Sequence, residues 1–259
     1  MKNLPPTVLV IAGNDPSGGA GLCADIQTLA QHGCHTAPVV TCITTQNTSK
    51  VLTNLPLAGN LVAEQAEAVL QDMPIAVCKI GLLGSEEIVE AVQSVLLNYP
   101  EISVVLDPVL ASGSGQSFTK KNICTAIINK ILPLTTIITP NSLEARTLTG
   151  EEKLENAAQK LIEYGCQHVC ITGTHETTDK VINTLYGIKS WIWNRLPHSY
   201  HGSGCTFASS VAGNIACGKD IITAVAKAQD YTWNSLNNGY KPGAGQHLPI
   251  RIRIRILPS

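Results

Sequence analysis

The chain has almost no net charge and no long apolar run near its start, and both absences exclude classes of function. Its 18 Lys and Arg residues against 19 Asp and Glu leave a formal net charge of -1 at pH 7. Binding to nucleic acid or to an anionic membrane usually needs a basic surplus, so we expect neither partner. The first residues, MKNLPPTVLV, carry an apolar run too short for a signal peptide or membrane anchor. We therefore expect a cytoplasmic protein with small-molecule partners.

The cysteines form no CxxC pair, which argues against a structural zinc site. There are 9 of them, an odd number scattered through apolar segments, so we interpret them as reduced core thiols rather than a disulfide framework. Internal repeats and low-complexity blocks are also missing. With 259 residues, 44% of them hydrophobic, the chain can bury a large core. We expect one domain over residues 1–259, in which the tail 241–259 has no assigned structure.

Short β-branched runs alternate with helix-like stretches along most of the sequence. The runs are apolar on both faces, which is typical of strands buried on both sides of a sheet. This alternation predicts an α/β fold with a mainly parallel sheet covered on both faces. We expect strands at residues 7–11, 36–45, 75–80, 102–106, 135–139 and 168–172, and helices at 20–32, 60–71, 85–97, 121–132, 141–148 and 152–164.

The alternation ends in the last third of the chain. Two strand-like runs flank Gly187 within residues 179–193 and predict a hairpin at the sheet edge. Helices are expected at residues 203–217 and 220–237, with Gly218 capping the first. The tail RIRIRI, residues 251–256, alternates with period two. A strand, a disordered end or an expression artefact would all fit this tail, and its pattern indicates no function.

The turn HGSGCT, residues 201–206, runs directly into a helix of small apolar residues. The first amides of a helix have no internal partners, and glycines let them approach an anion closely. Cys205 lies in this turn, where the helix dipole favours the thiolate. One segment thus offers an anion site and a base, which indicates phosphoryl transfer.

A second glycine-rich segment, NDPSGGAG at residues 14–21, joins the first strand to the first helix. It lacks the Lys-Ser/Thr ending of a Walker A loop, so it is not expected to cradle a triphosphate. A substrate lid and a plain turn both fit the segment. Asp25, one helical turn later, and Gln46, at the end of the second strand, could together read the donor and acceptor edge of a heterocycle.

Polar residues follow three other strands. Asp107 could hold Mg²⁺ or act as a turn residue. Asn141 and Glu144 could serve a phosphate and a metal-bound water, or form a capping box without any ligand. Thr172 and Gly173 lie in ITGTHE, which suits either a nucleotide-binding loop or a simple turn. Since ligands of parallel sheets bind at the carboxyl ends of strands, these residues are candidates for one site.

The chain resembles the hydroxymethylpyrimidine and phosphomethylpyrimidine kinases of thiamine biosynthesis, in the ribokinase-like superfamily. The resemblance spans residues 7 to about 237 and rests on motifs in the family's order: IAGNDPSGGAGLCAD, TTQNT, KIGLLG, LDPV, TPNSLEARTLTG and HGSGCT. It implies a three-layer αβα sandwich and a kinase that uses ATP and Mg²⁺. Relatives are often homodimers, so we expect the same here.

Carried over by position, the resemblance assigns a role to most candidates. Cys205 would be the base, and the amides of Gly202, Ser203, Gly204 and Cys205 would form the anion hole. The pyrimidine site would use Ala20, Asp25 and Gln46, with Leu82 and Val109 as walls. Asn141 and Glu144 would belong to the Mg-ATP side, with Thr172 and Gly173 near the nucleotide and Asp107 near the metal.

Two departures from the family keep alternatives open. Gly113 stands where many relatives carry a lysine near the phosphates, which makes phosphorylation of the monophosphate the less secure activity. The loop ITGTHE is also shorter than usual. A pyridoxal or pyridoxine kinase and a non-catalytic pyrimidine or nucleotide binder are the alternatives. Lys79, an interior lysine, has no assigned role.

Overall fold

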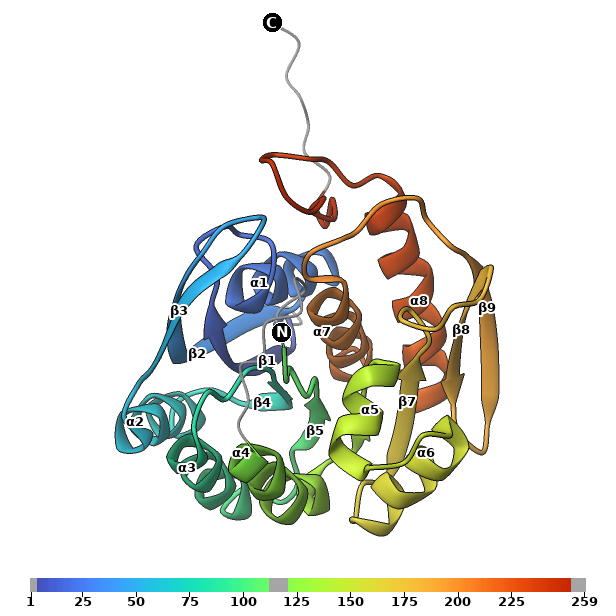
Figure 1. The fold of residues 1–259 in the computed structure, drawn as a ribbon. Coiled ribbons are helices and arrows are strands. Elements are labelled where there is room, and N and C mark those ends of the chain that lie inside the picture. The colour runs from blue at the N-terminus through green and yellow to red at the C-terminus, as the bar shows by residue number, and fades with distance from the viewer. Residues whose placement is uncertain (1–3, 112–120, 253–259) are drawn as a thin grey trace, which may run out of the picture.

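The computed structural model describes residues 4–111 and 121–252, and its centre is a nine-stranded sheet in the order β3-β2-β1-β4-β5-β6-β7-β8-β9 (Figure 1). The predicted strands all form: β1 (Thr7–Asn14), β2 (His35–Gln46), β4 (Ile75–Ile80), β5 (Ser103–Leu106), β6 (Ile137–Ile138) and β7 (His168–Thr172). They pair in parallel. Strand β6 is shorter than predicted.

Antiparallel strands close both edges of the sheet. The predicted hairpin is confirmed as β8 (Lys180–Leu185) and β9 (Lys189–Asn194), which extends the sheet beyond β7. At the other edge, β3 (Val51–Pro56) pairs with β2. This strand was not predicted, because its sequence VLTNLP mixes polar and apolar residues and most of it is exposed or half-buried.

Helices cover both faces of the sheet, which confirms the three-layer αβα sandwich. One face carries α1 (Gly21–Gln31), α7 (Ser203–Ala216) and α8 (Ile221–Asn237); the other carries α2 (Gly59–Leu70), α3 (Glu86–Leu97), α4 (Lys121–Ala126), α5 (Ser142–Thr149) and α6 (Leu154–Glu163). Strand β1 shows why both faces are apolar. Its Leu9 and Ile11 pack toward one helical layer, whereas Val8 and Val10 pack toward the other.

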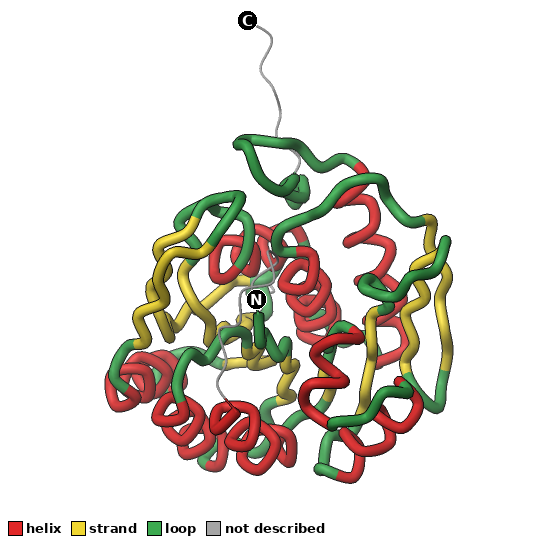
Figure 2. Tube along the Cα trace, in the orientation of Figure 1, coloured by secondary structure: helices red, strands yellow, loops and turns green. Residues whose placement is uncertain are grey.

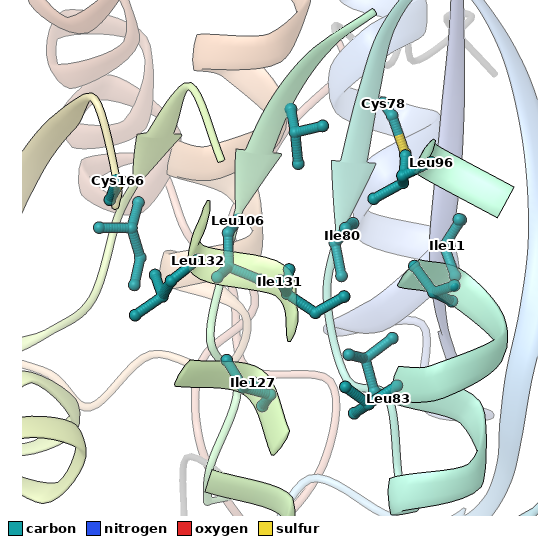
Figure 3. Close-up of a cluster of buried hydrophobic side chains, with 14 of the residues drawn as sticks. Ile11, Cys78, Ile80, Leu83, Leu96, Leu106, Ile127, Ile131, Leu132 and Cys166 are labelled. Atoms are coloured by element: carbon teal, nitrogen blue, oxygen red, sulfur yellow. The ribbon is translucent and has the colours of Figure 1, made fainter. Parts of the chain in front are cut away.

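The core beneath α2 to α6 joins aliphatic side chains of the central strands to those of the helices. Figure 3 shows Ile80 and Leu106 of neighbouring strands beside Ile131 and Leu132. The helix predicted at 121–132 is interrupted here: α4 ends at Ala126, and a π-helical turn (Ile127–Ile131) and a 3-10 turn (Leu132–Leu134) follow. Pro133 cannot donate a backbone hydrogen bond, which accounts for the altered end of this helix.

Loops alternate with these elements throughout the described chain, as the green segments of Figure 2 show. Because β1, β2, β4, β5, β6 and β7 are parallel, their carboxyl ends lie at one edge, and the loops that follow them carry the candidate residues. Within residues 4–111 and 121–252, no helix has the length and apolar character needed to cross a membrane.

Candidate active site

The helix α7 begins in the HGSGCT turn and has no side-chain cap. Its N-cap is Gly202, with a left-handed φ of 76° and no side chain that could accept from the first amides. Ser203 is half-buried and Gly204 is exposed. The amides of the first helical turn therefore have no side-chain cap and could bind an anion, a role that stays a prediction.

The two glycine-rich turns are in direct contact. A Cβ atom on Gly202 would overlap the carbonyl oxygen of Gly19, so only glycine fits there. A buried hydrogen bond joins the same turns: His201 Nε2 lies 2.8 Å from Asp15 Oδ2. The contact places residues 14–21 against residues 201–206. From their predicted roles we name these segments the acceptor-side turn and the anion turn.

Asp15 organises the turn before α1. Its carboxylate accepts from the amides of Ser17 and Ala20, each at 2.8 Å. Burial alone would raise the pKa of Asp15, but its hydrogen bonds to His201 and Ser17 outweigh burial and lower it. Asp15 and His201 were not among the predicted site residues, because polar residues within glycine-rich motifs are typical of turns. Ala20, a predicted substrate residue, is half-buried and serves as the N-cap of α1.

A buried charge cluster lies beneath these turns, and Lys79 is its centre. The Lys79 side chain is 0% exposed, with Nζ 3.0 Å from Asp25 Oδ1 and 3.6 Å from Asp107 Oδ2. Ser209 Oγ donates to the same Asp25 oxygen at 2.6 Å. Burial lowers the pKa of Lys79, but the charge of Asp25, with those of Cys205 and Asp107, reverses this and raises it. Lys79 is thus a structural cation that the sequence left without a role.

Asp25 lies within this buried charge cluster. It is 0% exposed, and its Oδ1 atom accepts from Lys79 and Ser209. Its Oδ2 atom is buried and has no hydrogen-bond partner among the described residues. A contact between Asp25 and the pyrimidine stays a prediction.

Cys205 lies in the first turn of α7 but is not activated in the way the sequence suggested. The residue is 8% exposed, and burial, reinforced by the charge of Asp107, raises the pKa of its thiol well above the ordinary value. The Lys79 ammonium and a backbone hydrogen bond from Gly21 act in the opposite direction and do not prevail. Burial thus opposes the thiolate that a position near a helix N-terminus favours.

The Asp107 carboxylate is close enough to this thiol for the two groups to shift each other's pKa. Burial raises the pKa of Asp107, with Lys79 and the contact with Cys205 opposing the effect. Asp107 was predicted to hold Mg²⁺. The Lys79 ammonium, 3.6 Å from the Oδ2 atom of Asp107, would repel a cation bound at that oxygen, and the magnesium role of Asp107 stays a prediction.

Asn141 and Glu144 form the capping box that the sequence left as one of two interpretations. Asn141 Oδ1 accepts from the amides of Leu143 and Glu144, and Glu144 Oε2 accepts from the Asn141 amide. The box does not exhaust the chemistry of Glu144. Burial, with the charge of Asp107, raises the pKa of Glu144 to about 8, so a nearby cation would favour its ionised form.

The donor set suits magnesium only when phosphate supplies further ligands. Across residues 4–111 and 121–252, no group of three His, Cys, Asp or Glu side chains could hold a metal ion. Mg²⁺ commonly takes one or two carboxylates and completes its shell with water and substrate phosphates. Glu144, a half-buried carboxylate whose ionised form is disfavoured without a cation, fits that mode.

A pocket opens beside the start of α7, between α8 and the strands β8 and β9. Ser203, Gly204 and Thr172 line it, together with the rings of Trp193 and Trp233, whose centroids are 6.0 Å apart in a stacked arrangement. Flat apolar rings next to an anion site suit a nucleotide base. Thr172 lines this pocket, and its contact with a nucleotide stays a prediction.

Gln229 lies at the back of this pocket and was missed by the sequence analysis. It is 2% exposed, and its Oε1 atom accepts from Asn183 at 3.0 Å and from Trp193 at 2.8 Å. Gly173 donates its amide to Asn183 Oδ1 at 3.1 Å. Gly173 thus supports the pocket wall and does not offer its amide to a ligand.

The remaining predicted substrate residues lie along the same sheet edge. Gln46 ends β2, and its Nε2 atom donates to Thr44 Oγ1 at 2.8 Å. Leu82, 9% exposed, follows β4, and the half-buried Val109 follows β5. Gly113, the position of the missing lysine, lies outside the described residues.

Comparisons with known proteins agree with this geometry. A sequence model of the family described as phosphomethylpyrimidine kinase matches residues 15–251. A protein of Aquifex aeolicus named hydroxymethylpyrimidine/phosphomethylpyrimidine kinase is 34% identical over 249 residues, which cover 93% of this chain and 98% of the relative.

Solved structures give the same result for the fold. The pyridoxal kinase of Staphylococcus aureus in complex with ADP has a TM-score of 0.86 at 30% identity, covering 97% of this chain and 96% of that one. The phosphomethylpyrimidine kinase of Clostridium difficile 630 has a TM-score of 0.77 at 31% identity, covering 88% and 98%. The expected ribokinase-like fold is thereby confirmed, and the chain belongs to the phosphomethylpyrimidine kinase family.

Proposed function

We propose that the chain transfers the γ-phosphoryl group of ATP to the hydroxymethyl group of 4-amino-5-hydroxymethyl-2-methylpyrimidine. The observation that carries the proposal is the uncapped start of α7, whose first turn contains Cys205 and whose Gly204 lies near the Asp107 carboxylate. Family membership supports the choice of acceptor. The monophosphate is proposed as a second acceptor, giving the diphosphate.

The amides of Ser203, Gly204 and Cys205 would receive the migrating phosphoryl group. Phosphoryl transfer proceeds through a loose transition state, so catalysis depends on alignment and on neutralising charge at the equatorial oxygens. The amides at the start of α7 meet that need because they are fixed before the substrate arrives. Glu144 would hold magnesium together with the nucleotide phosphates, and the metal would neutralise their charge.

Cys205 would accept the proton of the acceptor alcohol. Because burial raises the pKa of the thiol, the thiol would take the alcohol proton only as it passes its own proton on, and Asp107 is the neighbouring carboxylate. The alcohol proton then moves to sulfur as the S–H proton moves to Asp107, and the new O–P bond forms as the bond to ADP breaks. Lys79 stabilises the negative charge shared by Cys205 and Asp107.

The acceptor is tested by an ADP-release assay with hydroxymethylpyrimidine, its monophosphate and pyridoxal as separate acceptors. We expect the fastest turnover with hydroxymethylpyrimidine. Pyridoxal is the second candidate because a solved pyridoxal kinase matches the fold over nearly the whole chain, and a preference for it would replace our proposal. If none of the three acceptors supports ADP release, the non-catalytic alternative is favoured.

The role of Cys205 is tested by Cys205→Ala, with Cys205→Ser as the matched control. General-base contributions are on the order of 10² to 10⁴ in rate, so we expect Cys205→Ala to lose turnover on that scale. Its affinity for ATP should stay close to that of the parent, because the thiol acts on the acceptor. Equal losses in turnover and ATP affinity would show that Cys205 only shapes the turn.

We also propose that the chain works as a homodimer in the cytoplasm. Strand β3 is an edge strand, and its Leu52 and Leu55 are 54% and 63% exposed. Exposed apolar side chains on an edge strand suit pairing with a second copy. Sedimentation equilibrium measures the mass directly, and Leu55→Lys should shift a dimer toward monomer.

A further inference from the structure

The segment after α8 returns to the active site, and its end lies under both glycine-rich turns. Its backbone pairs with the residues just before α7: the His247 amide donates to Ser199 O, and the His201 amide donates to His247 O, both at 2.9 Å. The segment also rests on α8 through the amide of Ile250, which donates to Ser235 O at 3.0 Å. Figure 1 shows this red segment leaving α8 at the edge that carries the turns.

Arg251 ends this segment with a buried side chain, only 3% exposed. Its Nε atom donates to Thr206 Oγ1 at 2.8 Å, and one terminal nitrogen donates to Gln27 Oε1 at 3.3 Å. The other terminal nitrogen donates to the carbonyl oxygens of Gly19 and Gly202. One guanidinium group thus contacts the turn before α1, the turn before α7 and both helices that follow.

These partners are neutral oxygens, which makes the burial of a charged group expensive. A rigid fork of five donors can, however, hold several carbonyl groups at fixed positions, which a lysine cannot do. The carbonyl oxygens of Gly19 and Gly202 belong to the acceptor-side turn and to the anion turn. The first residue of the RIRIRI tail is therefore bound to the backbone of both turns.

We propose that Arg251 is a positioning residue for phosphoryl transfer: it fixes the spacing of residues 14–21 and 201–206, and thereby aligns the acceptor with the phosphoryl group. The inference rests on the proposed function of those two turns. Arg251 touches neither reacting group. It acts on turnover because misalignment of about 1 Å can cost on the order of 100-fold in rate.

The His201–Asp15 pair joins the same two turns independently, so the fold does not depend on Arg251 alone. The test compares Arg251→Met, which keeps the length of the side chain but removes every donor, with Arg251→Lys, which keeps the charge. Leu161→Ala is the matched control for lost stability, because Leu161 is 0% exposed on α6, in the opposite helical layer.

Steady-state kinetics are measured for all three variants well below their melting temperatures. For Arg251→Met we expect kcat to fall on the order of 10- to 100-fold, with the KM values for ATP and pyrimidine changing by less than about threefold. Arg251→Lys should recover only a small part of kcat. Leu161→Ala should lower Tm while leaving kcat near that of the parent. A kcat for Arg251→Met equal to that of Leu161→Ala would overturn the proposal.

Hydrogen–deuterium exchange of the unliganded variants separates this inference from the kinase proposal. In Arg251→Met we expect faster exchange in peptides covering both turns, and unchanged exchange in α3 and α6. Parental exchange in the turns would refute the positioning role even if the enzyme were inactive. Should Arg251→Met fail to fold, Thr206→Val removes one partner of the guanidinium, and unchanged exchange and kcat in that variant would also refute the role.

Discussion

The contact between the two glycine-rich turns yields a prediction within one motif: Gly202→Ala should be strongly destabilising, whereas Gly204→Ala should not. Gly202 has a φ of 76°, and a residue with a Cβ atom adopts that conformation at a cost of about 1–2 kcal/mol. The added methyl would also overlap the Gly19 carbonyl and lie 2.7 Å from the Arg251 guanidinium. Overpacking of a filled site typically costs about 1–3 kcal/mol more.

The sum is a loss of about 2–5 kcal/mol for Gly202→Ala. For a chain of this length, a loss of that size corresponds to a fall in Tm of roughly 4–20 °C. At Gly204 the nearest atom to an added Cβ is Asp107 Oδ1, at 3.6 Å, an ordinary contact. Alanine in the first turn of a helix is tolerated, so Gly204→Ala should melt within a few degrees of the parent, about 2 °C or less.

Thermal unfolding followed by circular dichroism measures both variants, and ADP release measures their activity. Gly204→Ala should lose turnover while keeping its stability, because its methyl group stands where the phosphoryl group would approach the amides. The reasoning fails if Gly202→Ala melts at the temperature of the parent, since the two turns would then not be in the contact described.

Two further predictions concern charged pairs. Lys79→Met leaves Asp25 and Asp107 without their buried counter-charge, so we expect the free energy of unfolding, measured in urea, to fall by about 3–5 kcal/mol. A fall of less than about 1 kcal/mol would contradict the structural role of Lys79. Hydrogen bonds from Arg146 lower the pKa of Glu176 from 4.5 to about 2. That pair therefore stabilises the fold fully above pH 4.5 and loses its effect as the pH falls toward 2. Glu176→Gln should make the free energy of unfolding vary less with pH in that window. An unchanged pH dependence would refute the pairing.

The sequence predicted the sheet and its turns because both depend on local patterns. Apolar runs identified the six parallel strands, and glycines identified the turns that meet at their carboxyl ends. Strand β3 escaped because an edge strand is largely exposed and lacks the alternation of a half-buried strand. The end of the helix after Ala126 depends on Pro133 and on packing beneath the sheet, which periodicity does not encode.

The sequence also placed Cys205 at the start of a helix, which the structure confirms, but it did not predict the burial of the thiol. Proximity to a helix N-terminus is a local feature, and it favours a thiolate. Burial and the charge of Asp107, which together reverse the effect, come from β5 and from the layer packed over α7. The ion pair between Asp25 and Lys79 was not predicted for the same reason, because the two residues lie 54 positions apart in the chain. Such partners are fixed by strand order, which the sequence pattern leaves open.

The site therefore depends on contacts between distant segments more than on its own motifs. The glycines of the two turns have no side chains that could hold one turn against the other, since glycine is what lets the backbones approach. The fixing groups must come from outside the glycines: His201 with Asp15 on one side, and Arg251 from a segment 232 positions beyond Gly19 on the other. Loss of the Arg251 contact should therefore act on alignment, and hence on kcat, before it acts on the fold.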